Sequence, residues 1–153
     1  MRVKAFLFAL CCILLLGACG TPKTGGTVYN IMDYGAKGDG VTDDAAAIQT
    51  AINQCSKSGG GTVLVPAGRT FMCSPFHLAS FVELHLEPNS CLLANPDEAA
   101  YTLSAFRDNR GEGMMWIYGQ DLKEVSITGT GTIDGNGVSF MGKELEDSYE
   151  LKP

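Results

Sequence analysis

Residues 34–65 read YGAKGDGVTDDAAAIQTAINQCSKSGGGTVLV, which places a glycine-rich turn, a helical segment and an apolar strand in succession. We predict the helix over residues 42–56, with Thr42 as N-cap and with Asp43 and Asp44 in the first turn, where the helix dipole favours negative charge. Three consecutive glycines then end the helix before the apolar strand. Apolar residues recur at helical spacing along one face, namely Ile48, Ala51, Ile52 and Cys55.

The rest of the chain reads as short strands separated by turns. In residues 81–87 apolar and polar side chains alternate, as in a half-buried strand. Three strand valines, Val63, Val82 and Val125, are 19 and 43 residues apart, close to one and two steps of a single repeat, and residues 116–118 supply a strand between them. Repeats of ~20–29 residues are typical of solenoids, and the leucine-asparagine consensus of leucine-rich repeats is absent. We therefore predict an all-β fold, a parallel β-helix, whose N-terminal end is covered by the helix.

The N-terminus has the pattern of a secretory signal. Arg2 and Lys4 precede an apolar run over residues 5–16, and two small residues stand directly before Cys19. The run is too short for a transmembrane helix, which needs ~20 apolar residues. The pattern predicts an exported protein.

Residues 16–19, Leu-Gly-Ala-Cys, are similar to the bacterial lipobox, in which the cysteine is acylated and becomes the new N-terminus. We predict a signal peptide at 1–18, a lipid on Cys19, a tether at 19–26 and the folded domain at 27–153. The lipid would hold the protein on a membrane of a bacterial cell envelope, on its periplasmic or surface side. An ordinary cleaved signal that happens to end near a cysteine is the alternative.

Composition narrows the possible partners and cofactors. The chain has 11 basic and 17 acidic residues and a net charge of −6, which becomes −8 when the signal is removed. An acidic chain without a basic run is a poor candidate for nucleic-acid binding. Three cysteines remain in the folded domain, and no pair of them has metal-ligand spacing. We predict that Cys55, Cys73 and Cys91 are small buried hydrophobic residues, and we expect a monomer without metal or cofactor.

Two stretches carry a resemblance to known proteins. Residues 34–44, with the helix that follows and residues 60–63, resemble the N-terminal capping unit of right-handed β-helix proteins that act on pectin. Residues 129–137, GTGTIDGNG, look like the corresponding segment of glycoside hydrolase family 28, the polygalacturonases. The likeness extends over nearly all of residues 31–137. It implies a right-handed parallel β-helix and hydrolysis of a pectic polysaccharide, α-linked galacturonan or rhamnogalacturonan, with inversion.

Inverting hydrolysis needs two carboxyl groups ~6.5–9.5 Å apart, one to protonate the leaving oxygen and one to activate water. The resemblance implies that Asn-Thr-Asp and Asp-Asp motifs supply them, aided by Gly-His-Gly and Arg-x-Lys motifs. In residues 27–153 the Asn-Thr-Asp, Gly-His-Gly and Arg-x-Lys motifs do not occur, and the Asp43–Asp44 pair stands where a structural role at a helix start explains it. We therefore assign no catalytic residue and no substrate-binding residue. We predict the N-terminal part of a hydrolase, inactive on its own.

Four polar residues are weaker candidates. Glu83, His85 and Glu87 project from one face of a strand, where such a trio can bind a divalent metal ion or supply acid–base groups. Alternation by itself predicts polar residues on a solvent-exposed face, and we favour that interpretation. His77 lies in a turn, and the sequence identifies no partner for it.

Asp134 and three aromatic residues are possible sugar contacts. Asp134 lies in a glycine-rich turn, where aspartate commonly bonds its own backbone, and we favour this role over one in a substrate groove. Trp116, Tyr118 and Tyr101 can stack on sugar rings, but burial between coils is at least as good an interpretation.

Two other functions remain open. A polysaccharide lyase of the same fold would need a basic residue and usually calcium, and the Ile-Asp-Gly segment at 133–135 favours the hydrolases instead. A noncatalytic β-helix would bind glycans or serve as a surface scaffold. Residues 143–152 are charged and offer no apolar stripe that would close a solenoid, which is in line with the N-terminal part of a longer enzyme.

Overall fold

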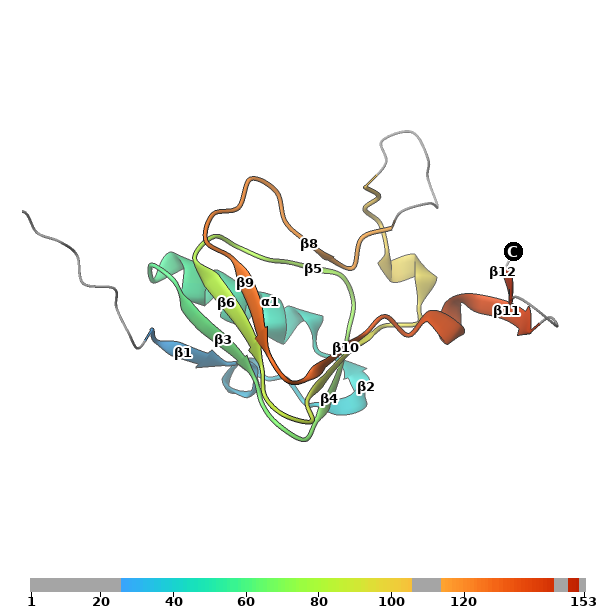
Figure 1. Ribbon diagram of the computed structural model, residues 1–153, viewed down its shortest axis with the longest axis horizontal. Helices are drawn as coiled ribbons and strands as arrows, with labels where there is room; N and C mark the ends of the chain where they lie inside the picture. The colour runs from blue at the N-terminus through green and yellow to red at the C-terminus, as the bar shows by residue number, and fades with distance from the viewer. Residues whose placement is uncertain (1–25, 106–113, 145–148, 152–153) are drawn as a thin grey trace, which may run out of the picture.

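Parallel strands stack in successive coils in the computed structural model, which describes residues 26–105, 114–144 and 149–151. Figure 1 shows strands of one sheet side by side, with the α-helix behind them. In chain order the elements are β1 Val28–Asn30, the 3-10 helix η1 Ile31–Tyr34, β2 Asp39–Asp43, α1 Ala45–Lys57, β3 Gly61–Val65, β4 Thr70–Cys73, β5 Phe76–His77, β6 Val82–Leu86, β7 Cys91–Ala94, η2 Glu98–Ala100, β8 Ile117–Tyr118, β9 Ser126–Gly129, β10 Thr132–Asp134, η3 Gly137–Phe140, β11 Met141–Glu144 and β12 Tyr149–Leu151.

Each coil places one segment on each of three sides. The first side is the parallel sheet β1-β3-β6-β9, the second is the parallel sheet β10-β7-β4-β2, and the third is the pair β5-β8. On the third side of the first coil α1 takes the place of a strand and packs against β5. The antiparallel pair β11-β12 lies outside the three sides of the stack. The predicted parallel β-helix is therefore confirmed.

The predicted stacking of repeats is confirmed, but the position predicted for one strand is wrong. Val63 pairs with Leu84, 21 residues later, and Leu84 pairs directly with Ile127, 43 residues later. The strand at 116–118, predicted to lie between them, instead pairs with β5 on the third side. The 43 residues thus form one long coil with an excursion between β7 and β8, because apolar alternation does not reveal which sheet a strand joins.

The inward-facing side chains of successive coils form one continuous core. Val63 of β3 and Leu84 of β6 are register partners and both are fully buried, as are Phe71 of β4 and its partner Leu92 of β7. The helix adds its predicted apolar face to this core, because Ile48, Ala51, Ile52 and Cys55 all have 0% exposure. The helix thereby covers the core at the first coil.

The helix begins three residues later than predicted. Thr42 and Asp43 belong to β2, which pairs with β4, and the residue at the N-cap position is Asp44. The amide and hydroxyl of Thr42 donate to the carboxylate of Asp39, so Thr42 is fixed within β2, ahead of the helix. The prediction of Thr42 as N-cap and of two first-turn aspartates is wrong, because pairing with a neighbouring strand outweighs the local capping preference.

The three cysteines of the folded domain are free thiols. Cys55 and Cys73 are buried, as predicted, whereas Cys91 is only partly buried. Burial raises the pKa of the Cys73 thiol to about 12, so this side chain packs as a neutral apolar group.

The last two strands of the stack carry half-exposed apolar residues. Ile127 of β9 is 46% exposed and Ile133 of β10 is 42% exposed, although their register partners Leu84 and Leu92 are fully buried. Each coil is therefore covered by the coil after it.

Among the described residues, no helix is both long and apolar enough to cross a membrane.

Candidate functional site

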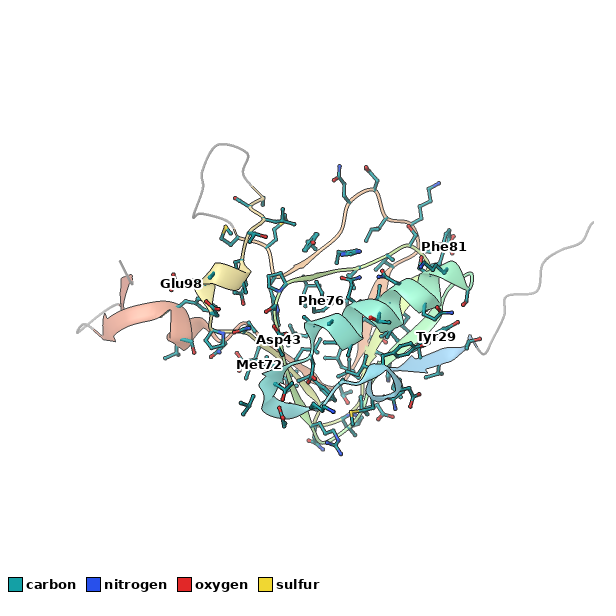
Figure 2. The ribbon with its side chains drawn as sticks, turned by 180° about the vertical axis from the view of Figure 1, so that it is seen from behind. Tyr29, Asp43, Met72, Phe76, Phe81 and Glu98 are labelled. Carbon is teal, nitrogen blue, oxygen red and sulfur yellow. The ribbon has the colours of Figure 1, made fainter. Side chains whose placement is uncertain are left out.

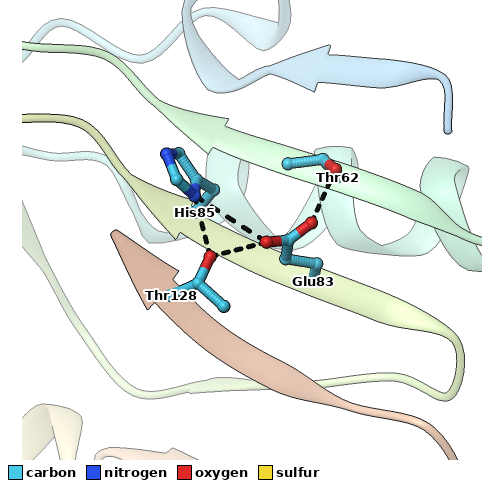
Figure 3. Close-up of polar contacts among 4 residues, drawn as sticks. All are labelled: Thr62, Glu83, His85 and Thr128. Atoms are coloured by element: carbon cyan, nitrogen blue, oxygen red, sulfur yellow. Dashed lines mark hydrogen bonds and ion pairs between the residues drawn. The ribbon is translucent and has the colours of Figure 1, made fainter. Parts of the chain in front are cut away.

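Glu83 and His85 form a polar cluster with two threonines on the outer face of the first sheet (Figure 3). One carboxylate oxygen of Glu83 accepts a hydrogen bond from Thr62 of β3 at 2.9 Å, and the other accepts one from Thr128 of β9 at 2.6 Å. The Nδ1 atom of His85 lies 2.7 Å from the Thr128 hydroxyl oxygen and 3.8 Å from Glu83. The bonds from Thr128 and then Thr62 lower the pKa of Glu83, so this carboxylate is ionised near neutral pH and fixed in position.

Glu87 does not join the cluster, although it lies on the same face in sequence. It follows the last residue of β6, and its carboxylate accepts a hydrogen bond from the amide of Ala67 at 2.9 Å. Within 26–105, 114–144 and 149–151, no three His, Cys, Asp or Glu side chains gather closely enough to hold a metal ion. Of the three residues that alternation places on one face, Glu83 and His85 are therefore joined through the Thr128 hydroxyl, and Glu87 lies apart from them in a turn.

An open depression of about 330 Å³ lies at the start of the strands of the first sheet, next to Glu83. Phe81 is the most exposed apolar residue of the depression, with 44% exposure. Figure 2 shows Phe81 near one end of α1 and Asp43 near the other. The sequence gives no signal for this site, because its residues come from four separate segments. They are Gly26, Gly59, Gly60, Gly61, Thr62, Phe81, Glu83, Glu124 and Ser126.

His77 and Tyr118 form a second polar surface, on the third side of the stack. They are register partners on β5 and β8, and their ring centroids are 5.9 Å apart with the rings tilted by 42°. Gln49 of α1 positions His77, since its side chain accepts from the His77 amide at 2.9 Å and donates to the His77 carbonyl at 3.1 Å. His77 therefore has the partner that sequence could not identify, 28 residues away.

The other two candidate aromatics have structural partners. The indole N–H of Trp116 donates to the carbonyl of Cys73 at 2.9 Å, and the side chain packs against the core. The hydroxyl of Tyr101 donates to the carbonyl of Asn95 at 2.8 Å, and its ring meets Phe140 edge to face. Tyr118 differs from these two aromatic residues, because its ring contacts the exposed side chain of His77.

The adjacent aspartates both have structural roles. Asp44 is 2% exposed and accepts from the amides of Lys37 at 2.7 Å and Gly38 at 3.0 Å, which closes the glycine-rich turn. Asp43 accepts from the amide of Ser74 at 3.0 Å and from its hydroxyl at 2.5 Å, and so links the first two coils. Burial acts to raise the pKa of Asp43, but the bonds from Ser74 and Ala45 outweigh it and lower the pKa.

Asp134 has the turn role that the sequence favours. Its carboxylate accepts from the amide of Asn136, two residues on, at 2.8 Å. Asn136 in turn donates to the carbonyl of Ala94 in the preceding coil at 3.0 Å. Asp134 thus holds the turn that follows β10, and Asn136 ties this turn to the preceding coil.

Comparison with known proteins gives one family match and several relatives. Residues 28–138 match the family model described as rhamnogalacturonase A/epimerase, pectate lyase-like. A polygalacturonase of Chamaecyparis obtusa is 31% identical over 122 residues, and alginate lyase 7 of Azotobacter vinelandii is 62% identical over 40 residues, 26% of this chain and 5% of the lyase. The crystal structure of a hyperthermoactive exopolygalacturonase from Thermotoga maritima matches with a TM-score of 0.61 and 36% identity over 71% of this chain.

The chain spans a small part of these relatives. It covers 22% of the Chamaecyparis obtusa polygalacturonase and 25% of the Thermotoga maritima chain. The resemblance predicted from residues 34–44 and 129–137 is confirmed at the level of family and fold.

Proposed function

Because the chain belongs to the rhamnogalacturonase A/epimerase, pectate lyase-like family, we propose that it is the N-terminal part of an enzyme that hydrolyses a pectic polysaccharide. The observation that carries the proposal is the match over 28–138, which includes both the turn at 34–44 and the segment at 129–137. The polygalacturonase relatives favour α-linked galacturonan as the substrate.

The chemistry we propose for the whole protein is inverting hydrolysis by two carboxyl groups, one acid and one base. The paired aspartates of this chain are not those groups, since Asp44 is buried and both carboxylates are engaged by backbone amides. We therefore expect the chain from Cys19 to Pro153 to be inactive. The test is a reducing-end assay on polygalacturonate with this purified chain, and release of reducing ends above a boiled control would contradict the expectation.

We propose that the His77–Tyr118 surface contacts the polysaccharide. The two rings lie side by side on β5 and β8, and an aromatic ring gives a sugar a flat apolar face to stack on. Titration of the chain with tetragalacturonate tests this. We expect Tyr118→Ala to weaken binding and Tyr118→Phe, which keeps the ring, to preserve it; equal binding by both variants would refute the contact.

A lyase of the same fold is the second candidate, and the identity with alginate lyase 7 over 40 residues is the observation that favours it. Lyases leave an unsaturated sugar that absorbs ultraviolet light, whereas hydrolases do not. An assay of the longest natural form of the protein on polygalacturonate and on alginate separates the two. A noncatalytic glycan-binding β-helix would give neither product while retaining tetragalacturonate binding.

We further propose that a lipid on Cys19 attaches the protein to a bacterial envelope membrane. Residues 1–18 and Cys19 lie outside the described residues, and the support is the lipobox-like sequence alone. Growth with a clickable fatty acid should label the wild-type protein but not Cys19→Ser. Label that persists in the variant would remove the anchor.

A further inference from the structure

Phe81 and Glu124 hold backbone conformations that their side chains disfavour. Phe81 has φ 66° and Glu124 has φ 52°, in the left-handed region that bulky residues seldom adopt. The other described non-glycine residues with positive φ are Asn89, Asp121 and Asn136, and asparagine and aspartate tolerate this region. Both strained residues line the depression of about 330 Å³, whereas the three tolerant ones do not. Gly60, which directly precedes β3 as Phe81 directly precedes β6, has φ 102°, so the positive φ belongs to the corner before the strand and places the side chains of Phe81 and Glu124 at the depression.

The lining of the depression presents hydrogen-bond acceptors, and His85 approaches Glu83 from outside the lining. Glu83 has a side chain 38% exposed, and Glu124 and Ser126 are exposed beside it. The nine residues of the lining include no lysine, arginine or histidine. A galacturonate unit would bring its own carboxylate against two others, so this lining disfavours the acidic sugar and favours a ligand with hydroxyl donors.

Phe81 completes the site with an apolar surface. Phe81 is 44% exposed and lines the depression together with Glu83, Glu124 and the glycines that follow α1. A flat apolar ring beside fixed polar groups is the combination that binds a sugar, since one face of the sugar is apolar and its edge carries hydroxyls. The threonine bonds to Glu83 fix its carboxylate before any ligand arrives.

We propose that this depression binds a neutral sugar unit, which stacks on Phe81 and donates hydroxyl hydrogen bonds to Glu83 and Glu124. The site lies at the start of the first sheet, whereas the His77–Tyr118 surface lies on the third side of the stack. It goes beyond the proposed pectic function, because its chemistry selects a neutral saccharide rather than the acidic one.

The test is calorimetric titration of the full chain, solubilised in mild detergent, with β-linked galactotetraose as the neutral probe. We expect Phe81→Gly and Glu124→Gly each to weaken its binding by about tenfold or more, because each removes one stabilising contact. Glycine adopts positive φ without strain, so neither substitution strains the backbone. Asp121→Gly is the matched control, since it removes one carboxylate and one positive φ of 52° from the same loop without touching the depression.

The proposal holds if galactotetraose binding is lost in Phe81→Gly and Glu124→Gly and is unchanged in Asp121→Gly, with circular dichroism showing all three folded. It is overturned if the wild-type chain does not bind galactotetraose, if Phe81→Gly binds as the wild type does, or if a trilysine peptide competes for the depression more strongly than the sugar. Tetragalacturonate separates the two proposals. If the wild-type chain does not bind tetragalacturonate, that result counts against the proposed pectic function and not against the neutral-sugar site. If the wild-type chain does bind tetragalacturonate, we expect Phe81→Gly to bind it equally well.

Discussion

At the scale of single residues, Asp43 and Asp44 are neighbours in sequence with separate tasks. Asp44 is buried and holds the glycine-rich turn through the amides of Lys37 and Gly38. Asp43 reaches across to Ser74 in the next coil. A sequence can show that two carboxylates stand at a helix start, but the choice between amide partners 6 and 31 residues away depends on how the chain folds.

Asp44→Asn should destabilise the protein by about 1–3 kcal/mol, because the amide group would place its own N–H donors against the amide of Lys37 or Gly38. Asp43→Asn should cost about 1 kcal/mol or less, since the amide oxygen can still accept from the N–H groups of Ser74 and Ala45 and the amide nitrogen can donate to the Ser74 hydroxyl. Urea unfolding of both variants measures the difference. Equal losses would show that Asp44 is not the buried acceptor that closes the turn.

Asp39 should titrate well below an ordinary aspartate. The amides of Thr42 and Val41 and the hydroxyl of Thr42 bond its carboxylate and lower its pKa from 3.8 to about 2. Because the folded pKa is the lower one, the stabilisation is fully present above pH 3.8 and is lost as the pH falls toward 2. NMR titration of the carboxyl carbon gives the pKa directly, and Asp39→Asn should remove this part of the acid dependence. A midpoint near 4 would contradict the prediction.

At the scale of elements, the strands form where alternation places them, but their neighbours are set by the path of the chain. β8 at Ile117–Tyr118 joins β5, although its position in sequence suggests a place between β6 and β9.

Close packing of successive coils also depends on glycine. Gly129 has φ 99°, and a Cβ built there would collide with the carbonyl oxygen of Leu86 in the coil before.

Gly129→Ala should therefore destabilise the stack more than Gly68→Ala does. Both glycines have positive φ, 99° and 71°, but a Cβ at Gly68 meets nothing within 4 Å. The cost at Gly68 should be the conformational strain alone, about 1–2 kcal/mol. At Gly129 the collision with Leu86 adds to that strain, since β9 must move away from β6. Thermal unfolding of the two variants compares them, and a smaller loss at Gly129 would count against this register.

At the scale of the whole molecule, the burial of a side chain depends on its place in the stack. Leu84 and Ile127 occupy the same inward position in successive coils, yet their exposures are 0% and 46%. The sequence shows two apolar residues in two strands of similar pattern. Which of them is enclosed follows from whether another coil lies over it, and this is a property of the assembled solenoid.

Leu84→Ala should cost about 2–5 kcal/mol, because it leaves a cavity in a closed core. Ile127→Ala should cost only about 1 kcal/mol, because much of its side chain is already in contact with water. Urea unfolding at one protein concentration tests the pair. Similar losses at the two sites would mean that β9 is covered in solution.

The sequence by itself determined the class of fold, the apolar face of α1 and the family, because alternation, helical spacing and the segments at 34–44 and 129–137 are local patterns. Only the tertiary structure decided where the helix begins, that β8 lies on the third side, and that Phe81 and Glu124 meet at one depression. The physical reason is that hydrogen-bond pairing between coils joins residues 21 to 43 positions apart, and these contacts outweigh the local preferences of a cap or a strand.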